Sequence, residues 1–223
     1  MTNAPQPVVA SSPATVAAVP PGAASAAAVV PAPPGDVSPP PTASAAPAEP
    51  PPAISIPGDG PAPEAVPIAG SEYVRGRTTI LVKAPIQRVR EAVFDFGHYA
   101  EFMPHYRGSR LLGRTPTGAR DVYMEVEAMH GVVRMWAEIE VAKPVVQADG
   151  TELIDIRFIK GNVKNFSGAW RLRKIDDVST QLALEVFLEP GIPLPTALIN
   201  RENLVGSRDG VQAMRGHAEQ PKK

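Results

Sequence analysis

The chain has 223 residues, 43% of them hydrophobic, which is enough to form a sizeable buried core. Its formal net charge is −1, which is not the strongly basic balance expected of a nucleic-acid-binding protein. It contains no cysteine, and this excludes disulfides, thiolate metal sites and cysteine nucleophiles.

Proline and charge divide the chain into two parts. Nineteen of the 27 prolines lie in residues 1–70, whereas all 22 lysines and arginines come after residue 70. Residues 1–70 are rich in Ala, Pro, Val and Ser and contain no aromatic side chain, so they cannot bury enough apolar area to offset the entropy of ordering. We therefore predict a disordered tail or tether over 1–70 and one folded domain over 71–220. A functional spacer and a dispensable tail remain open alternatives.

Targeting signals are absent from the sequence pattern. The first residues lack a Lys or Arg, prolines interrupt the apolar stretch that follows, and no run of about 18 apolar residues exists. We expect a cytoplasmic, monomeric bacterial protein that makes transient contact with membrane surfaces. A cell-envelope or periplasmic location is the alternative if the true start lies upstream.

The domain alternates between two hydrophobic periods. Residues 73–82 read as a strand, Pro85 suits the first position of a helix, and the apolar spacing through Phe96 is helical. Gly97 ends that helix, and a short helix over 98–103 is closed by Pro104. Period-two alternation then predicts six strands at 106–114, 121–129, 133–141, 154–158, 166–172 and 182–188. A long helix is predicted over 196–218.

These elements predict an α+β fold. A curved antiparallel seven-stranded sheet has one apolar face, so the long C-terminal helix must lie across that face. The two short helices after the first strand would close one end of the space between sheet and helix. Tyr99, Phe102 and Met103 would then cover a cavity that otherwise opens to water.

Three motifs resemble those of the START-like (helix-grip) superfamily. They are "ILVKAPIQRVREAVFDFGHYAEFMP", "FSGAWRL" and "GIPLPTALIN", in that order, within a resemblance that covers about residues 73–218. The chain is most similar to the polyketide cyclase/dehydrase and coenzyme-Q-binding type. This resemblance implies a cavity for a hydrophobic small molecule such as a lipid, sterol, quinone or polyketide, with no cofactor or metal.

The resemblance and the inward face of the strands together give a predicted ligand-binding set. Its members are mostly apolar and come from the short helices, the strands and the last helix: Tyr99, Phe102, Met103, Met124, Val126, Met135, Ala137, Ile139, Ile156, Phe158, Trp170, Leu184, Leu198, Ile199, Glu202 and Val205. Methionines on this face suit either a flexible pocket wall or a filled core.

No catalytic motif stands out, so we expect binding, sequestration or transport rather than catalysis. The alternative is a cyclase/dehydrase-type enzyme, with Glu202 as a weak catalytic candidate helped by Tyr99 or Tyr123. Glu202 could also orient a ligand hydroxyl or pair with a neighbouring arginine, and Asn200 and Asn203 could cap or bind ligand. A third alternative is a protein-interaction module. The four histidines, which lack the spacing of metal ligands, are His98, His105, His130 and His217.

Overall fold

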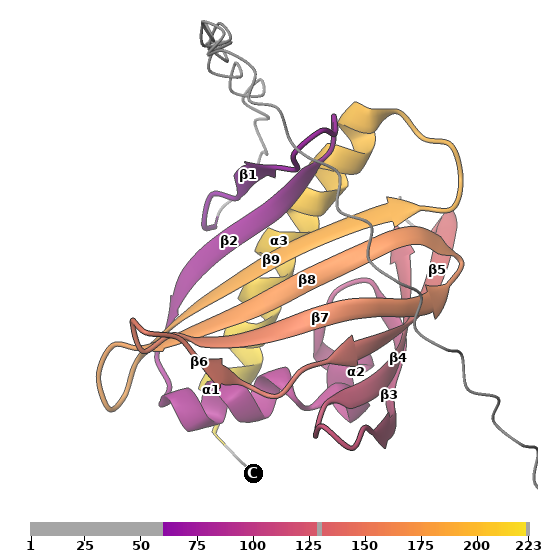
Figure 1. The fold of residues 1–223 in the computed structure, drawn as a ribbon. Coiled ribbons are helices and arrows are strands. Elements are labelled where there is room, and N and C mark those ends of the chain that lie inside the picture. The colour runs from indigo at the N-terminus through magenta and orange to yellow at the C-terminus, as the bar shows by residue number, and fades with distance from the viewer. Residues whose placement is uncertain (1–59, 129–130, 222–223) are drawn as a thin grey trace, which may run out of the picture. The chain divides into compact units, whose positions relative to one another are not determined.

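The computed structural model describes residues 60–128 and 131–221, so residues 1–59 of the expected tail and His130 lie outside the described part. The described chain forms a curved antiparallel sheet with one long helix, α3 (Thr196–Glu219), running along one face (Figure 1). This confirms the predicted helix-grip fold.

The sheet contains nine strands in the order β1-β2-β9-β8-β7-β5-β4-β3, with β6 paired to β7. Their bounds are β1 (Glu64–Pro67), β2 (Val74–Val82), β3 (Tyr106–Arg114), β4 (Arg120–Ala128), β5 (Val133–Val141), β6 (Val145–Val146), β7 (Glu152–Gly161), β8 (Val163–Lys174) and β9 (Thr180–Pro190). Except for β6, the strands from β3 to β9 pair in chain order, and β2 closes the meander by pairing with β9.

Two short strands raise the count above the seven that the sequence predicted. β1 pairs with β2 although it lies within residues 1–70, so strand pairing begins before residue 71. Pro67 can be part of β1 because an edge strand leaves one side of its backbone unpaired. β6 has only two residues and no room for an alternating pattern.

The helices after β2 are shorter than the sequence predicted. α1 (Ile86–Val93) ends four residues before Gly97, and a 3₁₀ turn, η1 (Phe96–His98), follows. α2 (Tyr99–Phe102) is a single turn. Val89 and Val93 of α1 are fully buried and make the predicted apolar stripe, which packs near the C-terminal half of α3.

α3 is attached to the sheet by polar side chains on its buried face. Asn200 Oδ1 accepts a hydrogen bond of 2.9 Å from the backbone N–H of Val74, and Asn203 Oδ1 accepts one of 2.9 Å from that of Leu188. One turn further on, the hydroxyl groups of Ser207 and Thr78 lie 2.8 Å apart. Strands β2 and β9 are therefore joined directly to the helix.

Close contact between α3 and β2 depends on a glycine. A Cβ atom added to Gly76 would lie 2.0 Å from the backbone oxygen of Asn203, well inside contact distance. Only glycine allows the strand and the helix backbone to approach this closely.

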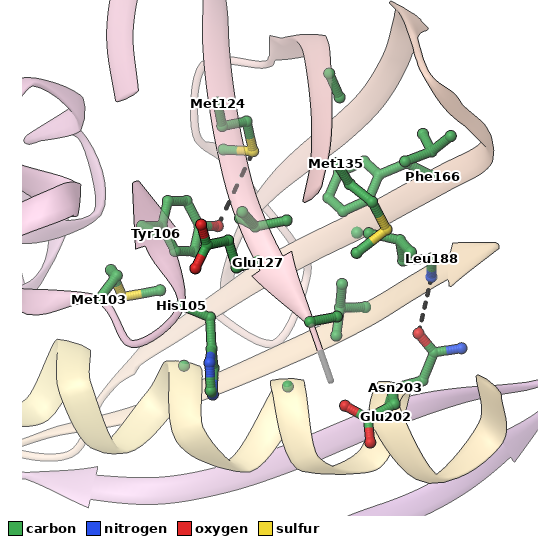
Figure 2. Close-up of a pocket in the computed structure, with 18 of the residues that line it drawn as sticks. Met103, His105, Tyr106, Met124, Glu127, Met135, Phe166, Leu188, Glu202 and Asn203 are labelled. Carbon is green, nitrogen blue, oxygen red and sulfur yellow. Dashed lines mark hydrogen bonds between the residues drawn. The ribbon is translucent and has the colours of Figure 1, made fainter. Parts of the chain in front are cut away.

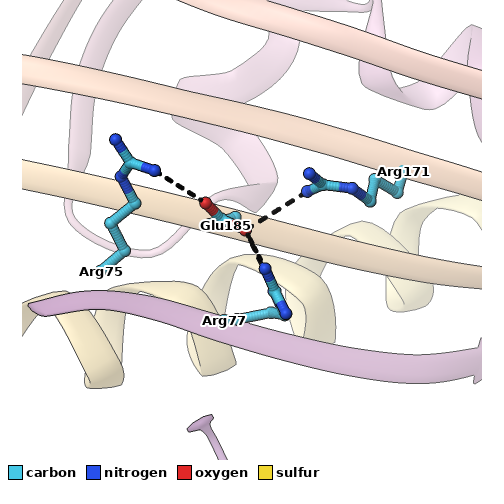
Figure 3. Close-up of polar contacts among 4 residues, drawn as sticks. All are labelled: Arg75, Arg77, Arg171 and Glu185. Carbon is cyan, nitrogen blue, oxygen red and sulfur yellow. Dashed lines mark hydrogen bonds and ion pairs between the residues drawn. The ribbon is translucent and has the colours of Figure 1, made fainter. Parts of the chain in front are cut away.

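The outer face of the sheet is stabilised by an ion-pair cluster. Figure 3 shows Arg75, Arg77 and Arg171 around the carboxylate of Glu185, with N–O distances of 3.3, 2.6 and 3.4 Å. Burial alone would raise the pKa of the Glu185 carboxyl, but hydrogen bonding to Arg77 and the charges of the three arginines hold that pKa below its usual value. The cluster joins strands β2, β8 and β9.

Candidate ligand-binding cavity

A cavity of about 220 Å³ lies between the sheet and the N-terminal half of α3. Its α3 lining runs from Leu198 to Gly210, whereas Val211 and Met214, further along the helix, are fully buried in the core. Tyr99 and Met103, from α2 and the residue after it, belong to the lining, so this segment contributes to the wall as the sequence predicted.

Fourteen of the sixteen residues in the predicted set line this cavity. They come from every element that the sequence indicated, and they are Tyr99, Met103, Met124, Val126, Met135, Ala137, Ile139, Ile156, Trp170, Leu184, Leu198, Ile199, Glu202 and Val205. The alternation of inward side chains on β4, β5, β7, β8 and β9 accounts for most of them. Their contact with a ligand stays a prediction.

The other two predicted residues lie elsewhere, which corrects the sequence interpretation. The ring of Phe102 stacks on the imidazole of His217 from the last turn of α3, with centroids 3.9 Å apart and planes 1° apart. Phe158 packs beside Gly161, where a Cβ would lie 3.2 Å from its Cε2. Phe158 pairs with the inward-facing Ile139 just before a bulge in the β5–β7 pairing, and it packs against the core without lining the cavity.

The size and the wall chemistry limit what the cavity can hold. Drug-sized pockets span about 300–1,000 Å³, and an engineered apolar cavity of about 150 Å³ takes up benzene. At about 220 Å³, this cavity accommodates a small ring system or part of a longer molecule. Met103, Met124 and Met135 are flexible side chains on its wall, and a change in their rotamers would reshape it.

The two tyrosines on the wall hold their protons tightly. Burial raises the pKa of Tyr106 to about 12 and that of Tyr99 well above its usual value. Tyr99 Oη donates a hydrogen bond of 2.5 Å to the backbone oxygen of Val93, which fixes the ring. Tyr123, the other tyrosine considered for proton transfer, does not line the cavity and stacks against Trp136. These tyrosines are therefore protonated at neutral pH.

Several polar side chains also line the cavity, and Figure 2 shows His105 and Glu127 across from α3, with Glu202 and Asn203 further along the helix. Glu202 lines the cavity, as predicted, and so do Glu127, Asp209 and His105, which the sequence analysis did not select. His105 has φ +66°, a left-handed conformation in which its carbonyl accepts a 2.8 Å hydrogen bond from the N–H of Glu127. From the sequence, His105 could have been selected because it is a polar residue directly after Pro104.

Asn200 and Asn203, for which the sequence left a capping or ligand-binding role open, bind the sheet, and Asn203 also lines the cavity. Both amide groups are used: besides accepting from the sheet, Asn200 Nδ2 donates to the oxygen of Glu72 at 3.0 Å and Asn203 Nδ2 to that of Val74 at 3.3 Å. These bonds attach the helix to the sheet, and a ligand contact by either side chain stays a prediction.

Metal binding and membrane spanning find no support in the described residues. Within 60–128 and 131–221, no group of three or more His, Asp or Glu side chains is arranged to hold a metal ion. In the same ranges, no helix combines the length and apolar character that crossing a bilayer requires.

Comparison with known proteins places the chain in a family. Residues 82–214, more than half of the 223, match the family model described as polyketide cyclase/dehydrase and lipid transport. No curated protein matches the chain by sequence.

Among solved structures, a STAR-related lipid transfer protein from Xanthomonas axonopodis aligns with a TM-score of 0.65 and 19% identity, covering 75% of this chain and 98% of that one. A START superfamily protein from Mycobacterium smegmatis gives 0.54 and 20%, covering 66% and 97%. The Zhui aromatase/cyclase from Streptomyces sp. R1128 gives 0.51 and 20%, covering 65% and 93%. At these identities the likeness shows the fold.

Proposed function

The chain belongs to the polyketide cyclase/dehydrase and lipid transport family, and from this membership and its cavity we propose that it binds a hydrophobic small molecule between the sheet and α3. The observation that carries the proposal is an apolar cavity formed by side chains from β4, β5, β7, β8, β9 and α3 rather than solid packing. Apolar cavities in proteins take up apolar molecules of matching size.

Binding is better supported than catalysis. General acid–base chemistry needs groups whose pKa values lie near the working pH, and the wall tyrosines are shifted away from it. Glu127, one of the acidic groups at the cavity, is paired with arginines, and its pKa is lowered, chiefly by hydrogen bonding to Arg107. We therefore propose a carrier or sequestering role for a lipid-, quinone- or polyketide-like molecule rather than cyclisation or dehydration.

The test is a size series of apolar probes. Benzene, naphthalene and anthracene are titrated into the purified protein by equilibrium dialysis, and unfolding is followed in parallel. We expect naphthalene to bind most tightly, because the cavity is somewhat larger than the one that fits benzene. A probe present at a free concentration of 100 times its Kd stabilises the folded protein by about 2.7 kcal/mol. Absence of binding by all three probes, together with no apolar ligand in organic extracts of the purified protein, would refute the proposal.

A further inference from the structure

Most polar side chains on the cavity wall are already bonded to the protein. Tyr99 donates to the Val93 oxygen, both amide atoms of Asn203 bind the sheet backbone, and Tyr106 Oη lies 4.0 Å from the Met124 sulfur. The bonds that Tyr99 and Asn203 make are not available to a ligand, because breaking them would loosen the fold. The remaining polar side chains are therefore the better candidates for recognising a polar ligand group.

Two of the three carboxylates on the wall are neutralised by arginines outside the lining. Glu127 Oε2 lies 2.7 Å from Arg107 and its Oε1 lies 3.1 Å from Arg134. Asp209 Oδ1 accepts a bond of 2.9 Å from Nε of Arg208, the preceding residue on α3. Both carboxylates already have cationic partners.

Glu202 is different, because its carboxylate has no hydrogen bond or ion pair within the described residues. It is half-buried on the cavity side of α3, next to Asn203, whose bond to Leu188 is drawn in Figure 2. One turn further on, Gly206 leaves open space: an added Cβ would have no atom within 4 Å. The half-buried carboxylate thus has free acceptor atoms and room beside them for a ligand group.

The wall also lacks positive charge to balance Glu202. No Lys or Arg side chain lines the cavity in the part of the chain that the structure describes. His105, an exposed residue of the lining, also has no side-chain partner among the residues that the structure describes. A ligand carboxylate or phosphate would therefore meet a like charge at Glu202, whereas a hydroxyl or a protonated amine would meet a hydrogen-bond acceptor.

We propose that Glu202 determines specificity by selecting ligands whose polar end donates a hydrogen bond, such as an alcohol or an amine, over carboxylates and phosphates. This inference rests on the proposed function, since it concerns the polar end of a molecule whose apolar body fills the cavity. Glu202 acts on the ligand as a hydrogen-bond acceptor, and no chemical step is required of it.

The experiment compares four probes that share one apolar body. Naphthalene, 2-naphthol, 2-naphthylmethylamine and 2-naphthoate are measured by equilibrium dialysis at pH 8 and low ionic strength with the full-length chain. Naphthalene is the reference within each protein, so every result is a ratio to its affinity. In the wild type we expect the amine to bind at least tenfold more tightly than the carboxylate, with the alcohol also above the carboxylate.

Three variants test the assignment. Glu202→Gln should reduce the difference between amine and carboxylate to less than about threefold, and Glu202→Lys should reverse their order. Glu101→Gln, which removes an exposed carboxylate that does not line the cavity, changes the net charge equally and should keep the wild-type difference. The reversal in Glu202→Lys separates a direct effect on ligand from a general loss of folding.

The outcomes separate the two proposals. If naphthalene binds but the amine and carboxylate bind equally in the wild type, or if their difference survives in Glu202→Gln, the role of Glu202 is refuted while the cavity proposal stands. If naphthalene and the smaller and larger hydrocarbons all fail to bind, the proposed function falls, and the inference about Glu202 falls with it.

Discussion

Filling the cavity from the protein side is the sharpest test of whether its volume is available to a ligand. Ala137 of β5 lines the cavity, and Ala137→Leu would project three more carbon atoms into it. At about 0.8 kcal/mol per buried carbon, these atoms would contribute roughly 2 kcal/mol of stability if the space is free. The whole volume of about 220 Å³, at about 24 cal/mol per Å³, corresponds to an upper limit of about 5 kcal/mol.

The same atoms should exclude ligand. A loss of about 2 kcal/mol in binding corresponds to roughly 30-fold weaker affinity, since each 1.4 kcal/mol is tenfold. We therefore expect Ala137→Leu to raise the free energy of unfolding in urea by about 1–2 kcal/mol and to weaken naphthalene binding about 30-fold in equilibrium dialysis. Stability would rise while ligand affinity falls only if the added side chain and the ligand compete for the same space.

A matched control lies on the other face of the sheet. Ala183 of β9 has the same orientation as Glu185, away from the cavity, so Ala183→Leu should leave naphthalene binding at the wild-type level. The reasoning is refuted if Ala137→Leu binds naphthalene within threefold of the wild type. It is equally refuted if Ala137→Leu lowers stability by more than about 2 kcal/mol, because overpacking would mean that the wall has no free space.

Three further predictions concern the fold around the cavity. Glu185→Gln should lower the free energy of unfolding in urea by about 2 kcal/mol. In the wild type, the lowered pKa of the Glu185 carboxyl contributes stability that is lost as pH falls below about 4.3, and the variant should lack this loss. An unchanged dependence of stability on acid pH would contradict this prediction. The carboxylate of Asp95 raises the pKa of His98 through its hydrogen bond and its charge. This pair therefore contributes stability that is present below about pH 6.5 and declines as pH rises through the raised pKa. In Asp95→Asn, the melting temperature should change less between pH 6 and 8 than in the wild type. Gly76→Ala should cost more than about 3 kcal/mol, because its Cβ would overlap the backbone of Asn203; near-normal urea unfolding would show that helix and strand separate easily.

The sequence predicted the inward face of the sheet well, because residue alternation depends on backbone geometry alone. Met124, Met135, Ile156 and Trp170 line the cavity as their positions in the strands indicated. Phe158 has the same alternation and packs against the core, but it does not line the cavity. The bulge beside it depends on the pairing with β5, which cannot be identified from one strand.

Contacts between segments that are distant along the chain could not be predicted from the sequence. The stacking of Phe102 on His217 joins residues that are over a hundred positions apart, and no local pattern indicates it. Asn200 and Asn203 could be recognised as polar residues on an apolar helix, but which backbone groups they bind depends on how α3 lies on β2 and β9. Glu202 was found from its helix face, whereas its lack of a partner within the described residues depends on the three-dimensional arrangement of its neighbours.

The bonds along α3 also bear on how a molecule enters and leaves. Asn200, Asn203 and Ser207 fasten the helix beside the cavity, and His217 Nε2 approaches Asp95 to 3.2 Å near its end. Swinging α3 outward would break all of these bonds together. The opposite wall is less restrained, because β3 is an edge strand with two register irregularities in its pairing to β4. The rates at which a ligand enters and leaves should therefore respond to changes in the β3–β4 hairpin, while the helix stays in place.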